Sequence, residues 1–318
     1  MNSRDQLLQE LRPASFAIAY RMLGSVSEAE DIVQEALLRL NQAIENGERI
    51  ASPGASVTTV TTRLAIDELR SARARRERYV GEWLPEPILT DDLDDPVRQA
   101  EMVDSLSVAM LVLLESLSPE QRAAFVLHDV FDYGYEEIAR IVGKNEDNVR
   151  QLATRARRHV AQRRPRFQTS QEQRDELARQ FFAAAHAGDL TGLEALLARD
   201  VVLTGDGGGK VPALARSLRG RGRVARTLLD WLKRLERIRV SMRLVEVNAG
   251  PGALALDEQG RLIGVWALEI AGGKIQSIRS IVNPDKLAHL GPTGDFNALL
   301  AYDLQQTRPG GRGHRSRR

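Results

Sequence analysis

The sequence predicts a multidomain chain in which an all-α N-terminal half is followed by an α+β domain. Three observations lead to this prediction. Apolar residues recur at helical spacing up to about residue 165, they alternate strictly with polar residues after residue 237, and a proline-rich acidic segment interrupts the helical part. The 318 residues are enough for about two domains. Helices followed by a run of strands are typical of the α+β class.

Composition excludes several classes of protein. The chain has no cysteine, which rules out disulfide scaffolds, thiolate catalysis and Cys-ligated metal centres. No apolar run approaches the roughly 18 residues of a membrane span, and the first ten residues are too polar for a secretory signal. We therefore expect a cytoplasmic protein without a membrane partner, and we expect no metal and no cofactor.

Periodicity and capping signals predict the helices of the first eighty residues. A first helix is expected over Arg4–Met22, ending at Gly24. Ser27 followed three residues later by Glu30 is a capping-box pattern that predicts the start of a second, amphipathic helix. Pro53, at a first-turn position, predicts a long third helix whose second half is basic.

The middle of the chain predicts a linker and then two helices. The segment Glu82–Pro96 contains three prolines and cannot continue a helix. A helix is expected over Asp104–Leu117, and Ser118 followed by Pro119 predicts the start of another.

A helix-turn-helix is the sharpest local signal in this half. A short helix is expected over Tyr135–Val142, a break at Gly143, and a longer helix from about Glu146 to Arg163 with Asn145 as its N-cap. The second helix leaves six polar side chains for base edges and phosphates. They are Asn148, Arg150, Gln151, Arg155, Arg157 and Arg158. An ordinary αα-hairpin is the alternative.

The distribution of charge favours a nucleic-acid partner. Six arginines lie between Arg63 and Arg78, and seven lie between Arg150 and Arg166 with no acidic residue among them. Such blocks are typical of chains that bind a polyanion, because each cation at a phosphate releases counterions. Solvated helix faces are the alternative. An acidic face at Glu30–Glu35 is suited to docking on a protein, although acids in a first turn also simply complement the helix dipole.

The C-terminal half predicts helices and then strands. The expected helices are Gln171–Ala187, Thr191–Ala198 and Arg223–Leu235, and the expected strands are Ile238–Leu244, Ala253–Leu256, Leu262–Ile270 and Lys274–Val282. The remainder, from Gly291, is rich in Gly and Arg and predicts disorder.

Taken together, these residues resemble a known family. The run Ala29–Ala36, the run Asp67–Arg76 and the helix-turn-helix at Tyr135–Arg158 are similar, in that order, to regions 2 and 4 of an extracytoplasmic-function (ECF) sigma factor. Three further motifs resemble the subgroup with a fused SnoaL-like (NTF2-like) C-terminal domain. They are Trp83-Leu84-Pro85-Glu86-Pro87, Asp206-Gly207-Gly208-Gly209-Lys210 and Asn283-Pro284-Asp285-Lys286-Leu287.

The resemblance implies roles for particular residues. Asp31, Gln34 and Glu35 match the helix that binds the β′ clamp helices of RNA polymerase core. The contacts implied for the −10 promoter element are Asn46, Arg63, Asp67, Arg70, Arg73, Arg75 and Arg76, and Asn148–Arg158 match the reader of the −35 element. No aromatic residue occurs between Asn41 and Arg78, so stacking platforms for single-stranded DNA are absent there and narrow promoter choice is expected.

The resemblance also implies a domain division. Region 2 is expected over residues 1–80, the linker over 81–100, region 4 over 101–166, a cone-like SnoaL-like domain over 171–290 and a tail over 291–318. The three motifs then join the linker to the C-terminal domain, which regulates the sigma factor in cis without a separate anti-sigma factor.

Catalysis by the C-terminal domain is the weaker expectation. SnoaL-like folds often hold an apolar pocket, and the candidate bases here are Asp206, His186 and Asp230, none with a partner at informative spacing. We expect no enzyme. The alternatives are a DNA-binding regulator whose C-terminal domain senses or converts a small apolar ligand, and a dimeric repressor that uses only the helix-turn-helix.

Overall fold

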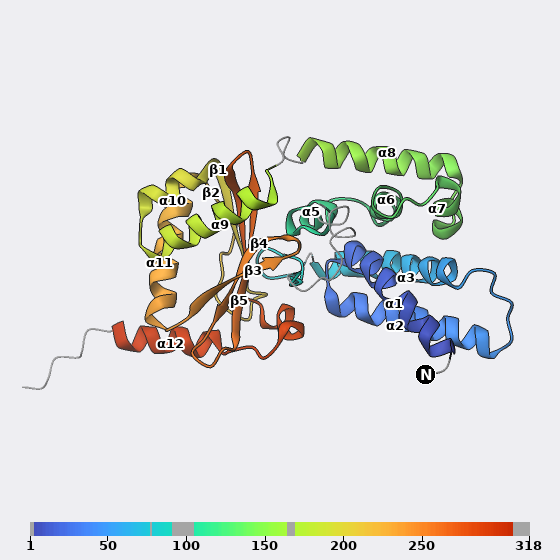
Figure 1. The fold of residues 1–318 in the computed structure, drawn as a ribbon, viewed down its shortest axis with the longest axis horizontal. Coiled ribbons are helices and arrows are strands. Elements are labelled where there is room, and N and C mark those ends of the chain that lie inside the picture. Colours follow the sequence, from blue (N-terminus) through green and yellow to red (C-terminus); the bar gives the residue numbers. More distant parts are fainter. Residues whose placement is uncertain (1–2, 77, 91–104, 164–168, 308–318) are drawn as a thin grey trace, which may run out of the picture.

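The computed structural model describes residues 3–76, 78–90, 105–163 and 169–307. The helical N-terminal half and the sheet-containing C-terminal half lie side by side, with the segment at 79–90 between them (Figure 1). The predicted fold class is confirmed: an all-α half is followed by a domain with a mixed sheet and helices. Within the described ranges, no helix has both the length and the apolar character that crossing a membrane requires.

The N-terminal half contains the following helices: α1 (Ser3–Leu23), α2 (Val26–Glu45), α3 (Pro53–Arg76), α5 (Val108–Leu114), α6 (Pro119–Phe125), the π-helical turn η1 (Val126–Val130), α7 (Tyr135–Val142) and α8 (Glu146–Arg163). Helices α1–α3 form one bundle and α5–α8 form another, and both contribute to a single apolar core. Helix α3 packs on α6 and α7, so the two bundles are in direct contact (Figure 1).

Local signals placed most of these helices correctly. Ser118 caps α6, where a helix start was predicted, through a capping box with Gln121, and Gly143 has the left-handed backbone (φ 68°) that ends α7. The expected box at Ser27 and Glu30 is wrong: α2 begins at Val26, and its N-cap is Ser25, whose hydroxyl accepts from the backbone N–H of Glu28. The helix expected over Asp104–Leu117 is also shorter, since α5 is capped by Ser107.

The C-terminal half contains α9 (Gln171–His186), α10 (Leu190–Leu196), β1 (Leu197–Asp206), β2 (Leu218–Arg219), α11 (Arg221–Arg237), β3 (Ser241–Val247), β4 (Gly250–Leu256), β5 (Leu262–Ala271), β6 (Lys274–Ile281), the 3-10 turns η2 (Pro284–Lys286) and η3 (Ala288–Leu290), and α12 (Phe296–Thr307). The six strands form one sheet in the order β2-β1-β6-β5-β4-β3. Only the β1–β6 pairing among these strands is parallel, because α11 and the β3–β5 meander separate the two strands in the chain.

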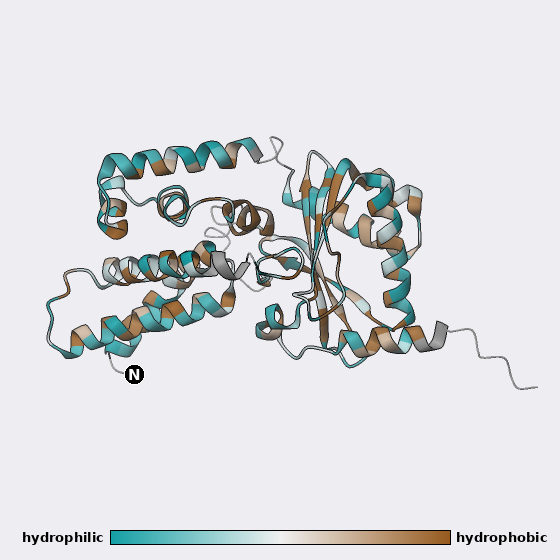
Figure 2. Ribbon diagram, turned by 180° about the vertical axis from the view of Figure 1, so that it is seen from behind, coloured by the Kyte–Doolittle hydropathy of each residue, from teal (hydrophilic) through white to brown (hydrophobic). Residues whose placement is uncertain are grey.

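The sheet is covered on both faces. Helices α9, α10 and α11 pack on one face, around Phe181, Leu228 and Trp266. The other face packs against the linker and α5 through Leu84, Val108 and neighbouring side chains. Figure 2 shows hydrophobic residues concentrated on the strands, as expected for a sheet buried on both faces.

Two predictions for this half were wrong in part. The strand expected from Ile238 begins later, because α11 continues to Arg237 and Arg239 turns the chain with a φ of 59° before β3. The disorder expected from Gly291 does not hold for residues 296–307, which form α12; Leu300 packs against the sheet and Asp303 accepts hydrogen bonds from Arg234 and Arg237. The end of the expected tail, 308–318, lies outside the described residues.

Candidate nucleic-acid interface and interdomain contacts

The helix-turn-helix presents most of its predicted contact residues to solvent. Asn145 caps α8, as predicted, by accepting from the backbone N–H of Asn148 at 2.9 Å. The exposed members of the predicted set are Asn148, Arg150, Gln151, Arg155 and Arg158. Arg157 differs: it is half-buried, with Nε 2.5 Å from Asp129 and a terminal nitrogen 3.1 Å from the Tyr135 hydroxyl. These hydrogen bonds hold α8 against η1 and the start of α7, and the bond that Arg157 donates to Asp129 raises the pKa of Arg157 above its ordinary value.

Two arginines of α3 form hydrogen bonds with the α5–α8 bundle. Arg63 donates to the backbone carbonyls of Ile141 (2.8 Å) and Arg140 (3.0 Å), at the C-terminal end of α7, where a cation is favoured by the helix dipole. Arg70 donates to Glu120 at 2.7 Å and to Asp67 at 3.0 Å. Three residues expected to contact the −10 element, Arg63, Asp67 and Arg70, therefore form hydrogen bonds within the protein.

The remaining −10 candidates divide into two groups. Asn46 follows α2 and is exposed, at the start of the loop that precedes α3. The side chains of Arg73, Arg75 and Arg76 lie outside the described residues.

The acidic face of α2 is exposed as expected. Asp31, Gln34 and Glu35 lie on its solvent side, while Ile32 and Val33 are buried in the core. Leu38, one turn beyond Gln34, is 47% exposed and adds an apolar side chain to the same face. Leu38 was not among the predicted residues, although its spacing from Gln34 and Glu35 places it on this face.

The linker is held by a buried cluster, here called the Asp206 cluster: Tyr79, Trp83, Asp206, Asn283 and Lys286. The carboxylate of Asp206, which is fully buried, accepts from the Tyr79 hydroxyl (2.5 Å), the backbone N–H of residue 84 (2.8 Å) and the ammonium of Lys286 (2.7 Å). The Lys286 nitrogen also lies 4.2 Å from the centre of the Trp83 ring and donates to the backbone carbonyl of residue 84. Asn283 donates to the Tyr79 hydroxyl at 2.9 Å.

The structure thus brings the three sequence motifs together. Gly208, with a φ of 60°, passes so close to the Asn283–Leu287 motif that a Cβ there would lie 2.3 Å from Asn283 Nδ2, and it would lie 3.1 Å from the Tyr79 hydroxyl. Burial, together with hydrogen bonding to Asp206, raises the pKa of Tyr79 above its ordinary value, so its hydroxyl remains a donor at neutral pH. Lys210 is different: it is exposed and pairs with Asp285 at the surface. The remaining motif residues are Leu84 and Pro85, which are buried, and Gly207, Gly209, Pro284 and Leu287, which shape or pack the two turns.

A second set of linker contacts reaches the N-terminal helices. Glu86 is buried, and its carboxylate accepts from the backbone N–H groups of Val26 (2.7 Å) and Ser27 (3.1 Å) and from the Ser25 hydroxyl (2.9 Å). A residue of the linker therefore caps the helix that carries the acidic face. This cap was not predicted from the sequence, because some sixty residues separate the partners.

The β3–β4 hairpin contacts both helical bundles and the linker. Its tip, Asn248 and Ala249, has positive φ at both residues (52° and 57°), as a two-residue type I′ turn requires. The fully buried Asn248 amide donates to the Tyr20 hydroxyl (2.7 Å) and the Leu106 carbonyl (3.0 Å) and accepts from the backbone N–H of Ile88 (3.0 Å). One side chain thus joins α1, the linker and the segment before α5.

The candidate catalytic bases are not assembled into a site. Asp206 belongs to the buried cluster, while His186 on α9 and Asp230 on α11 are exposed. None of the three lines the cavity of the C-terminal domain.

Comparison with known proteins agrees with this arrangement. Residues 7–75 match the family model for sigma-70 region 2, and residues 107–160 match that for sigma-70 region 4. The chain is 39% identical to the ECF RNA polymerase sigma factor SigJ of Mycobacterium tuberculosis over 287 residues, which cover 87% of this chain and 91% of that protein. It is 33% identical to the probable ECF sigma factor SigI of the same species, over 85% of this chain and 90% of SigI.

The likeness extends to the whole fold. The crystal structure of M. tuberculosis SigJ superposes with a TM-score of 0.72 at 36% identity, covering 89% of this chain and 98% of that one. Two sigma-70 regions in the expected order, and a relative matched across both halves, together identify the family. The chain belongs to the ECF sigma factors of RNA polymerase, which bind the core enzyme and direct it to promoters.

Proposed function

We propose that the C-terminal domain regulates this sigma factor in cis by holding regions 2 and 4 in a closed arrangement that promoter binding must open. Region 2 corresponds to α1–α3 and region 4 to α5–α8. The observation that carries the proposal is that Arg63 and Arg70, two solvent-exposed −10 candidates, donate hydrogen bonds to region 4.

The geometry of a promoter supports this proposal. By their positions, the −10 and −35 elements are about 25 base pairs apart, which is about 85 Å along B-DNA at roughly 3.4 Å per base pair. Helices α3 and α8 are only about 36 Å and 27 Å long, and both belong to bundles in direct contact. Even end to end, α3 and α8 would span only about 63 Å, so placing them on both elements requires regions 2 and 4 to separate.

The C-terminal domain opposes that separation through the linker. The Asp206 cluster holds residues 79–84 on the sheet, and Asn248 bonds to region 2, the linker and the start of the α5–α8 segment. A covalently attached domain needs no partner in solution to do this, because its effective concentration is high. Regulation in cis therefore replaces a separate anti-sigma factor in this proposal, and the domain regulates without enzymatic turnover.

Fluorescence energy transfer between regions 2 and 4 tests the proposal directly. The chain has no cysteine, so two introduced cysteines are unique labelling sites. Gln9→Cys on α1 and Glu136→Cys on α7 lie at exposed positions outside the predicted polymerase and DNA contacts. We expect high transfer in the free protein and a marked fall when core polymerase and promoter DNA are added. Transfer that stays unchanged in a transcribing complex contradicts the closed arrangement.

A further inference from the structure

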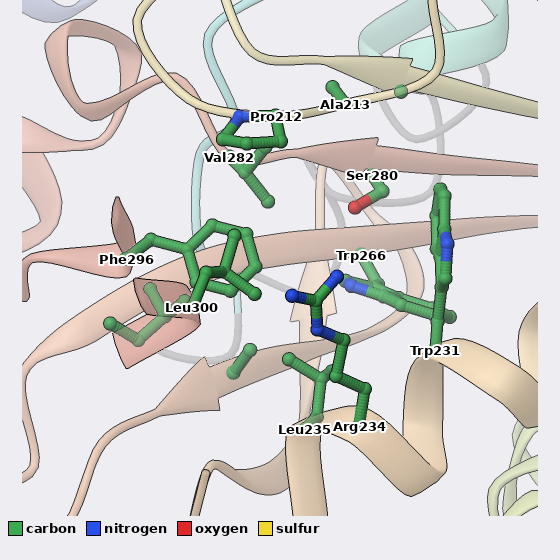
Figure 3. A pocket seen from close by; sticks show the side chains of 13 residues that line it. Pro212, Ala213, Trp231, Arg234, Leu235, Trp266, Ser280, Val282, Phe296 and Leu300 are labelled. Atoms are coloured by element: carbon green, nitrogen blue, oxygen red, sulfur yellow. The ribbon is translucent and has the colours of Figure 1, made fainter. Parts of the chain in front are cut away.

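The C-terminal domain contains a cavity of about 170 Å³ between the sheet, α11 and α12 (Figure 3). Its walls are mainly apolar and include Trp231 from α11, Trp266 from β5, and Phe296 and Leu300 from α12. Residue 213, in the exposed loop between β1 and β2, forms part of the opposite wall. An engineered apolar cavity of about 150 Å³ accommodates benzene, so this cavity has room for a molecule with a single ring.

One cation faces this apolar space. Arg234, on α11, donates from Nε to Asp303 at 2.9 Å, which fixes the direction of the side chain. Its two terminal nitrogens point towards the middle of the cavity in Figure 3, and neither has a hydrogen-bond partner among the residues that the structure describes. A guanidinium presented in this way matches the two oxygens of a carboxylate.

Helix α12 holds both the wall and the cation in place. Asp303 on α12 is 5% exposed and accepts from Arg237 at 3.0 Å as well as from Arg234. Arg237 does not line the cavity. Asp303 is therefore a positioning residue, and the closing helix and the orientation of Arg234 depend on the same ion pairs.

We propose that this cavity binds a small one-ring carboxylate, with its ring among Trp231, Trp266 and Phe296 and its carboxylate on the terminal nitrogens of Arg234. The aromatic walls supply contact area for the ring. The cation supplies selectivity, because a neutral analogue leaves the guanidinium without its anionic partner.

Occupancy of the cavity is coupled to the Asp206 cluster through the sheet. Side chains alternate between the two faces of a strand. On β1, Gly205 lines the cavity while Asp206, the next residue, binds the linker. Just beyond β6, Val282 lines the cavity while Asn283 binds Tyr79. Helix α12 also reaches the glycine-rich motif, since its Asn297 side chain donates to the backbone carbonyl of residue 210 at 2.9 Å. The bound carboxylate thus changes the stability of the contacts between the linker and the Asp206 cluster. This coupling rests on the proposed function.

Binding is tested on the full-length protein with benzoate as the probe and benzamide as its uncharged analogue. Two of the three tryptophans in the chain line the cavity, so intrinsic fluorescence reports binding, and calorimetry supplies the affinity. We expect benzoate to bind at one site at least tenfold more tightly than benzamide. Arg234→Gln should remove this preference, whereas the matched Arg237→Gln, which breaks the other ion pair of Asp303, should retain it. Absence of benzoate binding, equal affinity for both probes, or equal losses in the two variants overturns the proposed site.

A second variant guards against misfolding of Arg234→Gln. The Ser280 hydroxyl points into the cavity from β6, so Ser280→Leu fills the space without touching an ion pair, and it should abolish benzoate binding. Retained benzoate affinity in Ser280→Leu overturns the site.

Run-off transcription then separates binding from regulation: benzoate should change the yield of the wild-type holoenzyme and leave that of Arg234→Gln unaltered. Benzoate binding without a change in transcript yield overturns only the coupling between the cavity and the linker. The closed arrangement is tested separately and without benzoate: it fails if energy transfer between Gln9→Cys and Glu136→Cys is unchanged when core polymerase and promoter DNA are added.

Discussion

Replacing Lys286 by methionine leaves a buried carboxylate without its cation. Asp206 is fully buried, and the Lys286 side chain is 8% exposed. Removing one partner of a buried ion pair costs about 3–5 kcal/mol, because the remaining charge is uncompensated. Asp206 keeps neutral donors from Tyr79 and from the backbone N–H groups of residues 84 and 208, which places the cost near the lower end, about 3 kcal/mol.

The same free energy sets the expected change in function. When the whole of this free energy is lost from the binding of the linker to the C-terminal domain, about 3 kcal/mol shifts the equilibrium between closed and open forms by a factor of roughly 150. Lys286→Met should therefore lower the denaturant midpoint and alter run-off transcription from a cognate promoter while core binding persists.

Lys210→Met is the matched control. Lys210 and Asp285 form an exposed pair, with side chains 52% and 62% exposed, and such pairs contribute at most about 1 kcal/mol. The double variant Asp206→Asn with Lys286→Met should recover part of the loss, since no charge remains buried. Equal unfolding free energies for Lys286→Met and Lys210→Met would refute the reasoning.

Three further predictions concern other contacts. Asn248→Gly keeps the positive φ but leaves the partners of the buried amide unpaired, and should cost about 2–3 kcal/mol in chemical denaturation, whereas Ala249→Gly should stay within about 1 kcal/mol of wild type. Glu86→Ala removes the cap of α2 and should cost about 1–2 kcal/mol by thermal unfolding, with weaker core binding; undiminished stability would contradict the capping role. Hydrogen bonding from Arg237 lowers the pKa of Asp303, so docking of α12 is stabilised above the ordinary carboxyl pKa of about 4 and is lost as pH falls through the lowered value. Tryptophan fluorescence should report this acid transition in the wild type, and an identical transition in Asp303→Asn would argue against Asp303 as its origin.

The sequence was most informative where the signals are local. Ser118, Gly143 and Asn145 act within a few residues of themselves, and each ends or begins a helix as predicted. The family motifs placed Asp206 and Lys286 near the linker, and their side chains meet there. The roles of Asp31 and Asn148 towards polymerase and DNA stay predictions.

The contacts that the sequence did not reveal are long-range. Tyr20 and Asn248 are 228 residues apart, and nothing in either local pattern indicates the other. Helix α12 was hidden by the Gly- and Arg-rich composition beyond it, although Phe296, Leu299, Leu300 and Asp303 have helical spacing. The hydrogen bonds from Arg63 to the end of α7 could not be predicted. A basic helix has the same sequence pattern whether its arginines face phosphates or the carbonyls at a helix terminus.

The Asn248 hairpin tip and the buried Lys286 are both synthesised after the helices of regions 2 and 4. A ribosome completes the last helix of region 4 at residue 163, but Lys286 follows about 120 residues later. At 5–20 residues per second, each newborn molecule spends roughly 6–25 s with a finished promoter-reading half and no restraint on it. The promoter-reading half is therefore unrestrained only while the chain is still attached to the ribosome, and faster translation shortens that interval.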